Sequence, residues 1–337
     1  CKTAAFCIPL VSYLLANPEA SALVLTPTRE LACQVHDALK KMVGKKSAIR
    51  TTLLIGGEPM FKQCKQLEGS PKLIVGTPGR INDHLERRTL KLDAAGFLVL
   101  DETDRMLDMG FSVQIERIVA YLPKVRQTLM FSATLAPEIV KMADTYLKNA
   151  IRVSVGSVSA PVEKIAQEIV HTTENEKYGL LLERIAKESG SLVVFVKTKY
   201  GTEKLATKLR KDGHEAEAIH GDLRQNKRTR VLTSFRQNKS RILVATDVAA
   251  RGLDIPHIEC VVNYDLPESP EDYIHRIGRT GRAGAEGKAV SFITEQDGFK
   301  WRSICRLLNP KEKGAAVRPD NITVTGEPHK REGGFES

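Results

Sequence analysis

Three acidic side chains stand close together in the first half of the chain, directly after an apolar run. Asp101, Glu102 and Asp104 follow residues 97–100, Phe-Leu-Val-Leu. Repulsion between carboxylates and their desolvation oppose such a cluster, unless a cation or a hydrogen-bond donor offsets them. In one interpretation they are solvated first-turn residues of a helix, favoured by its dipole. In the other, Asp101 holds a metal ion, Glu102 orients or deprotonates an attacking water, and Asp104 hydrogen-bonds a neighbour.

The first residues of the chain, Cys-Lys-Thr-Ala-Ala-Phe, resemble the end of a phosphate-binding P-loop. In that motif the lysine contacts the β- and γ-phosphates and the hydroxyl residue holds Mg²⁺, roles that Lys2 and Thr3 would fill. Cys1 stands where the motif has glycine, which places a Cβ inside the loop. A Lys-Thr pair alone has little meaning, so this interpretation depends on the other clusters. Together they predict ATP and Mg²⁺, with the metal held by Thr3 and Asp101.

Two further clusters add hydroxyls and guanidinium groups. Ser132 and Thr134 follow another apolar run and are suited to couple with the acidic cluster, although alone they are typical of a helix cap. The segment HRIGRTGR (275–282) carries Arg276, Arg279 and Arg282, spaced by glycines. The guanidinium groups of such arginines bind phosphate oxygens and stabilise the negative charge that develops during phosphoryl transfer. The competing interpretation is a basic surface loop, or arginines that bind only nucleic acid.

Short apolar runs rich in β-branched residues precede nearly all of these clusters. Because the runs are continuous rather than alternating, they predict strands buried on both faces, and the helix-like segments between them imply parallel pairing. Ligands bind beyond the carboxyl ends of such strands, where the polar residues stand. The predicted strands with their polar ends are ALVLTPTRE (22–30), KLIVGTPGR (72–80), FLVLDETD (97–104), TLMFSAT (128–134), LVVFVKTK (192–199), AEAIHGD (216–222), RILVATD (241–247), CVVNYD (260–265) and AVSFIT (289–294).

The pattern occurs twice, which predicts an α/β fold with two doubly wound parallel-sheet domains in tandem. A chain of 337 residues is also longer than a single hydrophobic core usually allows. Ser, Gly and Pro interrupt the pattern near 152–166, so we place the domains at 1–153 and 162–308. Residues 309–337 show no sustained period and are rich in Gly, Pro and Lys, which predicts a flexible tail.

Composition narrows the class of protein and of partner. The formal charge of +10 favours a polyanionic partner, and the aromatic content of 5% argues against extended base-stacking platforms. No apolar run is long enough to cross a bilayer, and no basic-then-apolar leader opens the chain. Six cysteines form no Cys-x-x-Cys pair, which indicates reduced thiols in a cytoplasmic protein. Because the chain starts at Cys1 without methionine, we expect it to be a fragment.

The motifs occur in the order and spacing of the DEAD-box RNA helicases, a superfamily 2 family that the chain resembles over about three hundred residues. They are PTRELA (27–32), GG (56–57), TPGR (77–80), DETD (101–104), SAT (132–134), Gln225 with Arg228, ATDVAARGLDI (245–255) and HRIGRTGR (275–282). The acidic motif at 101–104 reads Asp-Glu-Thr-Asp, whereas the family has Asp-Glu-Ala-Asp. We expect this change from alanine to threonine to be tolerated. The amino-acid sequences of these motifs are most similar to those of the bacterial members of the family.

The resemblance implies two RecA-like domains and assigns a role to each motif. Arg279 and Arg282 would act as arginine fingers, Asp254 would contact the ribose, and His275 would connect the two catalytic faces through the acidic box. The residues implied to face the RNA backbone are Pro27, Thr28, Arg29, Gly57, Thr77, Arg80, Thr198, Gly221, Arg228 and Thr246. Backbone contacts carry little sequence information, so RNA would be bound largely independently of its sequence. The family's adenine-reading segment and first strand are absent from this sequence.

The sequence therefore predicts an ATP-dependent RNA helicase, an RNA-dependent ATPase that unwinds short duplexes or remodels RNA–protein complexes. The native protein would hydrolyse ATP, whereas this fragment would bind ATP poorly. Protein partners would bind through flanking segments.

An alternative from another class is a non-catalytic RNA-binding clamp or scaffold, for which Cys1 in place of glycine is the supporting feature. A DNA-translocating helicase is the less favoured enzyme, because PTRELA and HRIGRTGR match the RNA-acting branch. Robust ATP turnover would exclude the clamp.

Overall fold

The computed structural model describes residues 2–44, 47–134, 137–154, 165–250, 258–281, 286–308 and 322–325. It divides into two compact units, Cys1–Val155 and Gly156–Ser337. The division falls inside the predicted seam at 152–166. Each unit contains its own sheet and its own hydrophobic cores.

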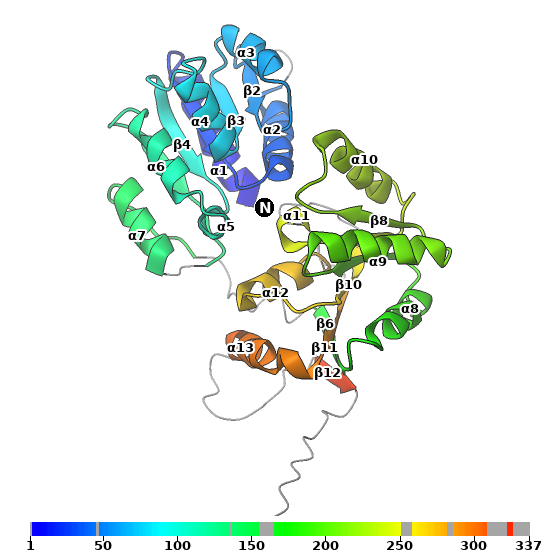
Figure 1. The fold of residues 1–337 in the computed structure, drawn as a ribbon. Helices are drawn as coiled ribbons and strands as arrows, with labels where there is room; N and C mark the ends of the chain where they lie inside the picture. The colour runs from blue at the N-terminus through cyan, green and yellow to red at the C-terminus, as the bar shows by residue number, and fades with distance from the viewer. Residues whose placement is uncertain are drawn as a thin grey trace, which may run out of the picture. The chain divides into compact units, whose positions relative to one another are not determined.

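Unit 1 contains a five-stranded parallel sheet with the order β2-β3-β1-β4-β5. Helices cover both faces of this sheet (Figure 1). The strands are β1 (Ser21–Leu25), β2 (Thr51–Leu54), β3 (Leu73–Gly76), β4 (Ala95–Leu100) and β5 (Gln127–Met130). The helices are α1 (Lys2–Ala16), α2 (Arg29–Val43), α3 (Met60–Glu68), α4 (Pro78–Glu86), α5 (Thr103–Asp108), α6 (Ser112–Ala120) and α7 (Pro137–Tyr146).

Successive side chains of the central strand β1 enter two separate cores. Ala22 and Val24 pack with residues of α1 and α2, whereas Leu23 and Leu25 pack with residues of α4 and α6. All four are fully buried. A strand covered on both faces needs an apolar residue at every position, because its side chains alternate between the faces. This explains why the predicted strand is a continuous apolar run.

Unit 2 contains a seven-stranded sheet with the order β12-β6-β11-β10-β7-β9-β8, and all of its strand pairs are parallel. Its α8 and α9 pack with one core, and α10, α12 and α13 with the other. The strands are β6 (Ile165–His171), β7 (Ser191–Phe195), β8 (Ala216–Ile219), β9 (Ile242–Ala245), β10 (Ile258–Asn263), β11 (Gly287–Ile293) and β12 (Ile322–Thr325). The helices are α8 (Lys177–Lys187), α9 (Lys199–Lys211), α10 (Gln225–Arg236), α11 (Asp247–Ala250), α12 (Pro270–Ile277) and α13 (Gly298–Leu308), with a 3₁₀ turn at Glu295–Asp297.

Every predicted strand is present, and three strands were missed. β2 has only four residues, Thr-Thr-Leu-Leu, and lies at an edge of its sheet. β6 alternates between buried and more exposed residues over most of its length, so a search for continuous apolar runs passes over it. β12 corrects the prediction of a flexible tail at 309–337, because residues 322–325 pair in parallel with β6. The remaining tail residues lie outside the part of the chain that the structure describes.

None of the helices in the described ranges is both long enough and apolar enough to cross a bilayer. The longest, α1 and α2, have 15 residues each.

Candidate nucleotide and nucleic-acid site

The acidic cluster lies at the carboxyl end of β4, as the strand pattern predicts. Asp101 directly follows β4 and is 5% exposed, and its Oδ1 accepts a hydrogen bond from the Glu102 N–H at 3.0 Å. Glu102 has a left-handed backbone conformation, with φ +51° and ψ +54°. A non-glycine residue in this region is strained, and such strain is concentrated at functional sites. The turn leaves the Glu102 side chain half-exposed beside the buried Asp101 carboxylate.

Asp104 connects the acidic cluster to the Ser-Ala-Thr segment. Its Oδ2 accepts from the backbone N–H groups of Ala133 at 3.0 Å and Thr134 at 3.1 Å, and from the Thr134 hydroxyl at 3.4 Å. Its Oδ1 accepts from the Arg105 N–H at 3.0 Å. The expectation that Asp104 hydrogen-bonds a neighbour is confirmed. The side chain therefore fixes the loop after β5 against the first turn of α5.

Ser132 differs from its neighbours in this network. Its Oγ is buried, yet it has no hydrogen-bond partner among the described residues. Leaving a buried hydroxyl unpaired costs about 1–3 kcal/mol, so such atoms are uncommon in native proteins. An unpaired hydroxyl beside Asp104 and Thr134 fits a position that a ligand or a bound water completes.

The start of α1 lies beside the same strand ends. The Phe6 ring packs on that of Phe131, with centroids 5.4 Å apart, and Phe131 directly precedes Ser132. Burial, and secondarily the Asp101 carboxylate, raises the pKa of the Cys7 thiol to about 12. Thr3 is half-buried one turn earlier. The first turn of α1 presents backbone N–H groups, which favour phosphate. Lys2 opens this helix, and Cys1 lies outside the described residues.

The chemistry of these side chains suits Mg²⁺ rather than a softer metal. The Thr3 hydroxyl and the Asp101 carboxylate are oxygen ligands, and among the described residues no three or more His, Cys, Asp and Glu side chains gather as a cage. Mg²⁺ is usually held by one or two carboxylates together with water and substrate phosphates. The residues present therefore fit Mg²⁺ bound together with a nucleotide.

Three motifs that lie far apart in the sequence meet at the ends of β1, β2 and β3. A Cβ at Gly56 would lie 3.1 Å from the Arg29 guanidinium, so glycine lets this side chain lie across the loop. The Arg80 guanidinium donates to the Glu58 carbonyl at 3.0 Å. Gly57 between them has φ +85°, which disfavours any other residue. PTRELA, GG and TPGR thus form one cluster.

The two threonines of this cluster, Thr28 and Thr77, occupy the N-cap positions of helices. Thr28 caps α2, since its Oγ1 accepts from the Leu31 N–H at 3.2 Å, and Thr77 stands at the N-cap position of α4. Both are buried, as is Pro27. The N-termini of α2 and α4 therefore start from the same edge of the sheet. Helix N-termini and arginines together favour a phosphate backbone.

In unit 2, the described part of HRIGRTGR spans the end of α12 and the turn that follows. His275 Nδ1 is buried, has no hydrogen bond to any described residue, and lies 4.0 Å from Asp272 Oδ1. Arg279 is half-exposed, and its Nε donates to the His275 carbonyl at 3.1 Å. Asp254 and Arg282 fall outside the described residues, so their predicted roles stay predictions.

Arg276 corrects the interpretation of three arginines as one array. It is 2% exposed, and it donates through Nε and Nη2 to both carboxylate oxygens of Asp247, at 2.5 and 2.7 Å. Its Nη1 donates to Asn263 Oδ1 at 3.1 Å and to the Asp265 carbonyl at 2.6 Å. Its guanidinium also lies 4.8 Å from the centroid of the Phe195 ring. A guanidinium satisfied inside the protein holds α12 against the ends of β9 and β10.

The residues of unit 2 that were expected to face RNA fall into two groups. Thr198 and Gly221 are exposed, and Thr198 caps α9 by accepting from the Gly201 N–H at 2.9 Å. Thr246 and Arg228 are buried at 7% exposure. Arg228 donates to the carbonyls of His220 at 3.3 Å and Ala249 at 2.8 Å, so it ties the end of β8 to α11.

Known proteins resemble this chain over both units. The DEAD/DEAH box helicase family model matches residues 2–143, and the helicase conserved C-terminal domain model matches residues 176–284. The DEAD-box ATP-dependent RNA helicase CshA of Geobacillus kaustophilus is 44% identical over 332 residues, covering 98% of this chain and 70% of that protein.

The chain belongs to the DEAD-box helicase family.

Solved structures of DEAD-box proteins confirm the two RecA-like domains. Dbp5 of S. cerevisiae bound to RNA and ADP BeF3 is 33% identical, with a TM-score of 0.84, and the match covers 96% of this chain and 82% of that one. DEAD-box ATP-dependent RNA helicase 30 of Arabidopsis thaliana is 41% identical over 94% of this chain. The chain spans 55% to 60% of the length of this and two other curated relatives.

The threonine in the DEAD box is accommodated by the surrounding backbone. Thr103 is fully buried, its hydroxyl donates to the Leu100 carbonyl at 3.3 Å, and its N–H donates to the Phe131 carbonyl at 2.9 Å. A buried hydroxyl is tolerated when it is hydrogen-bonded. This geometry supports the prediction that an Asp-Glu-Thr-Asp box functions as a DEAD box does.

Three residues with clear structural roles were not among the predicted site residues. Asp247, the partner of Arg276, could have been predicted, because it is an acidic residue at the end of the predicted strand segment 241–247. Gln63 and His84 lie inside helices α3 and α4 with no sequence signal, and only their contacts identify them.

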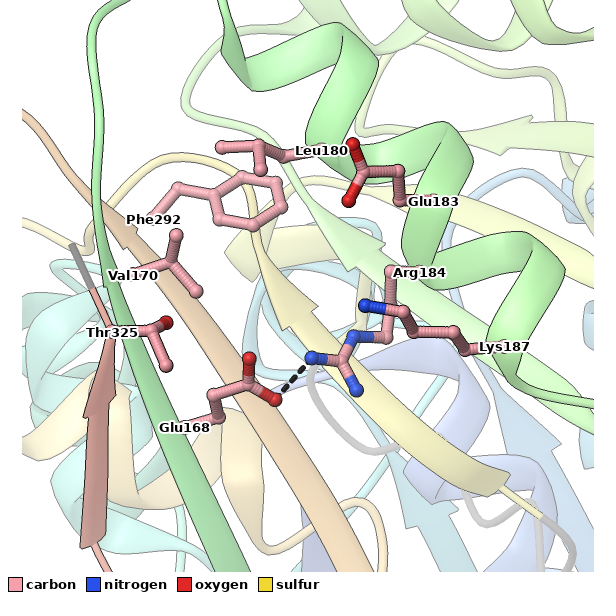
Figure 2. Close-up of a pocket in the computed structure, with 8 residues that line it drawn as sticks. All are labelled: Glu168, Val170, Leu180, Glu183, Arg184, Lys187, Phe292 and Thr325. Carbon is pink, nitrogen blue, oxygen red and sulfur yellow. Dashed lines mark hydrogen bonds and ion pairs between the residues drawn. The ribbon is translucent and has the colours of Figure 1, made fainter.

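Unit 2 also contains a cavity of about 210 Å³ that holds none of the predicted site residues. Figure 2 shows Glu168 paired with Arg184 across it, with Val170, Leu180 and Phe292 on its apolar side. Thr325 of β12 lies on its rim. The cavity lies between α8 and the strands β6, β11 and β12, and it has no part in the DEAD-box site.

Proposed function

We propose that the full-length protein is an ATP-dependent RNA helicase, an RNA-dependent ATPase that unwinds short RNA duplexes or remodels RNA–protein complexes. The observation that carries this proposal is the link from Asp104 to Ala133 and Thr134, beside the unpaired Ser132 hydroxyl. This link couples the loop after β5 to the acids that would serve the metal and the water. Relatives named ATP-dependent RNA helicases support the same activity.

In this proposal unit 1 binds the phosphates. Lys2 and the first turn of α1 contact the phosphate oxygens, Thr3 and Asp101 hold Mg²⁺, and Glu102 orients the attacking water or takes its proton. Bound Mg²⁺ would neutralise the charge that develops on the phosphates. Glu102 is available to the water because its side chain is half-exposed, whereas the neighbouring Asp101 is buried.

Unit 2 supplies the remaining groups of the proposed site. Arg279 and Arg282 stabilise the charge on the transferred phosphoryl group, Asp254 contacts the ribose, and His275 connects to the acidic box. Arg276 takes no part in phosphate binding, because Asp247 occupies its guanidinium. Its contribution is to hold α12 in place.

RNA is bound through its backbone in this proposal. In unit 1 the contacts come from Pro27, Thr28, Arg29, Gly57, Thr77 and Arg80, and in unit 2 from Thr198, Gly221 and Thr246. Arg228 supports the loops rather than reaching RNA, since its guanidinium donates to backbone carbonyls. Protein partners would bind through flanking segments. The protein would be cytoplasmic, which the lack of a Cys-x-x-Cys pair in the sequence supports.

The test replaces the proposed water-orienting carboxylate in the full-length protein. Glu102→Gln keeps the size of the side chain but removes the base, so RNA-stimulated ATP hydrolysis is expected to fall about 10²–10⁴-fold. Glu116→Gln, at an exposed position of α6, is the matched control and is expected to leave the rate unchanged. The measurement is phosphate release with and without single-stranded RNA.

Two outcomes would contradict this proposal. If Glu102→Gln and Glu116→Gln hydrolyse ATP equally well, the role given to Glu102 is wrong. If the wild-type full-length protein binds RNA but hydrolyses no ATP, a non-catalytic clamp is the better description. Unwinding of long DNA duplexes would instead favour a DNA-translocating helicase.

A further inference from the structure

Beneath the Gly56-Gly57-Glu58 loop lies a pair of buried polar side chains that no motif includes. His84 of α4 is fully buried, and Gln63 of α3 is 2% exposed. His84 Nε2 and Gln63 Oε1 are 3.3 Å apart. A buried polar pair persists only when its hydrogen bonds are satisfied, so its partners indicate its role.

The two ends of the Gln63 amide face different partners. Its Nε2 donates to the Ile55 carbonyl at 3.0 Å and to the Glu58 carbonyl at 3.4 Å. These carbonyls lie on either side of the two glycines. Since Nε2 faces two acceptors, Oε1 is the end that faces His84, and an amide oxygen only accepts. His84 Nε2 must therefore carry a hydrogen.

The other nitrogen of His84 completes the chain of hydrogen bonds. Nδ1 lies 2.8 Å from Thr89 Oγ1, in the turn after α4. Burial, and then the Arg80 guanidinium, lowers the pKa of His84, which favours the neutral ring. In a neutral ring with hydrogen on Nε2, Nδ1 accepts from the Thr89 hydroxyl. The Thr89 Oγ1 also lies 3.2 Å from the His84 carbonyl, so its one hydrogen is directed to Nδ1 or shared between these two acceptors. All donors then point the same way, from Thr89 through His84 and Gln63 to the loop.

The Glu58 carbonyl is also held from the outer side. Arg80 donates to it at 3.0 Å, and Arg80 stands one helical turn before His84 on α4. The hydrogen bonds from Gln63 and from Arg80 together fix this loop, in which Gly57 has φ +85°. We propose that Gln63 and His84 are positioning residues that hold the Gly56-Gly57-Glu58 loop in its RNA-binding shape.

This inference rests on the proposed function, because it concerns how the loop meets RNA. A loop that is already fixed loses little conformational freedom on binding, whereas a loose one must be ordered at that moment. Loss of the Gln63 donors should therefore weaken RNA binding without changing the chemical step.

The experiment compares two charge-matched variants on the same helix in the full-length protein. Gln63→Glu replaces the donating amide with a carboxylate, which repels both carbonyls. In the wild type the Thr52 hydroxyl donates to Gln66 Oε1 at 2.8 Å, and Gln66→Glu keeps an oxygen that can accept this bond. We expect Gln63→Glu to raise the RNA concentration for half-maximal ATPase stimulation about tenfold, with the maximal rate within about twofold of wild type. Gln66→Glu should match wild type in both values.

Further measurements separate this proposal from folding defects and from the proposed function. Gln63→Met, which adds no charge, is expected to show the same change in half-saturating RNA if Gln63→Glu does not fold. The ¹⁵N shifts of His84 should report hydrogen on Nε2. Equal half-saturation in the Gln63 and Gln66 variants, or hydrogen on Nδ1 alone, would overturn the inference. If wild type shows no RNA stimulation, the proposed function fails instead.

Discussion

The two units share one architecture but use their strand-end polar residues differently. In unit 1, Glu102 is half-exposed, and the Ser132 hydroxyl has no partner within the described part of the chain. Arg29 and Arg80 lie over the loop at the end of β2. In unit 2, Arg228, Arg276 and Thr280 are each less than 9% exposed, and all three donate to neighbouring backbone carbonyls. Residues of similar type and position are thus left available for a proposed ligand in unit 1 and are hydrogen-bonded inside the protein in unit 2.

The difference shows that a motif mixes residues that contact a ligand with residues that hold the others in place. Arg276 and Arg279 stand three positions apart, yet Arg276 is 2% exposed and donates to both carboxylate oxygens of Asp247, whereas Arg279 is half-exposed. An arginine that donates to Asp247, Asn263 and a carbonyl has few donors left for a phosphate. Motif membership alone therefore does not define a ligand contact.

The largest effect should come from separating these two arginines. Arg276→Ala leaves Asp247 and the Asp265 carbonyl without their donors, and breaking a buried pair typically costs about 3–5 kcal/mol. Trp301, the only tryptophan, packs on Tyr273 of α12 with ring centroids 5.9 Å apart, so its fluorescence reports unfolding of unit 2. Urea unfolding followed by this fluorescence should show a much lower midpoint.

Arg279→Ala is the comparison variant for this measurement. It should move the urea midpoint far less, because Arg279 is half-exposed, while it removes a predicted phosphate contact and lowers ATP turnover. The reverse pattern, with Arg276→Ala stable but inactive, would show that Arg276 serves a ligand and that the two units do not differ in this way.

An intermediate effect is expected at the link in unit 1. Asp104→Asn weakens charge-assisted bonds to the N–H groups of Ala133 and Thr134, which are worth about 1.5–3 kcal/mol each. Amide exchange at these two positions should become about tenfold faster or more. Ser132→Ala should leave it unchanged, since the Ser132 hydroxyl has no partner among the residues that the structure describes. Equal protection in Asp104→Asn and wild type would remove the proposed coupling.

The smallest effect is expected within the acidic box itself. Thr103→Ala removes the buried hydroxyl with its bond to the Leu100 carbonyl and also the γ-methyl group, so stability should fall by about 1–2 kcal/mol. ATP turnover should stay at the wild-type rate, because the hydroxyl points to backbone rather than to the site. A large loss of turnover would mean that Thr103 acts in the reaction, and that the sequence Asp-Glu-Thr-Asp is not equivalent to a DEAD box.

Much of the fold was predictable because parallel strands buried on both faces leave a clear pattern. Leu23 and Leu25 enter one core while Ala22 and Val24 enter the other, so the whole run is apolar. The same reasoning missed β6, whose alternate residues are more exposed, and β12, which is a short strand inside a polar segment. β12 is an edge strand, and edge strands carry weaker patterns because only part of their surface is buried, whereas β6 lies between β12 and β11.

The sequence by itself determined the class of this protein: strand runs, strand-end acids and ordered motifs all follow from local spacing. Only the tertiary structure decided which polar residues are satisfied inside the protein and which are left for a ligand. Arg276 pairs with Asp247, 29 positions away, and Gln63 reaches His84, 21 positions away. Such contacts depend on how helices pack on the sheet, and packing brings together residues whose separation in the sequence has no fixed period.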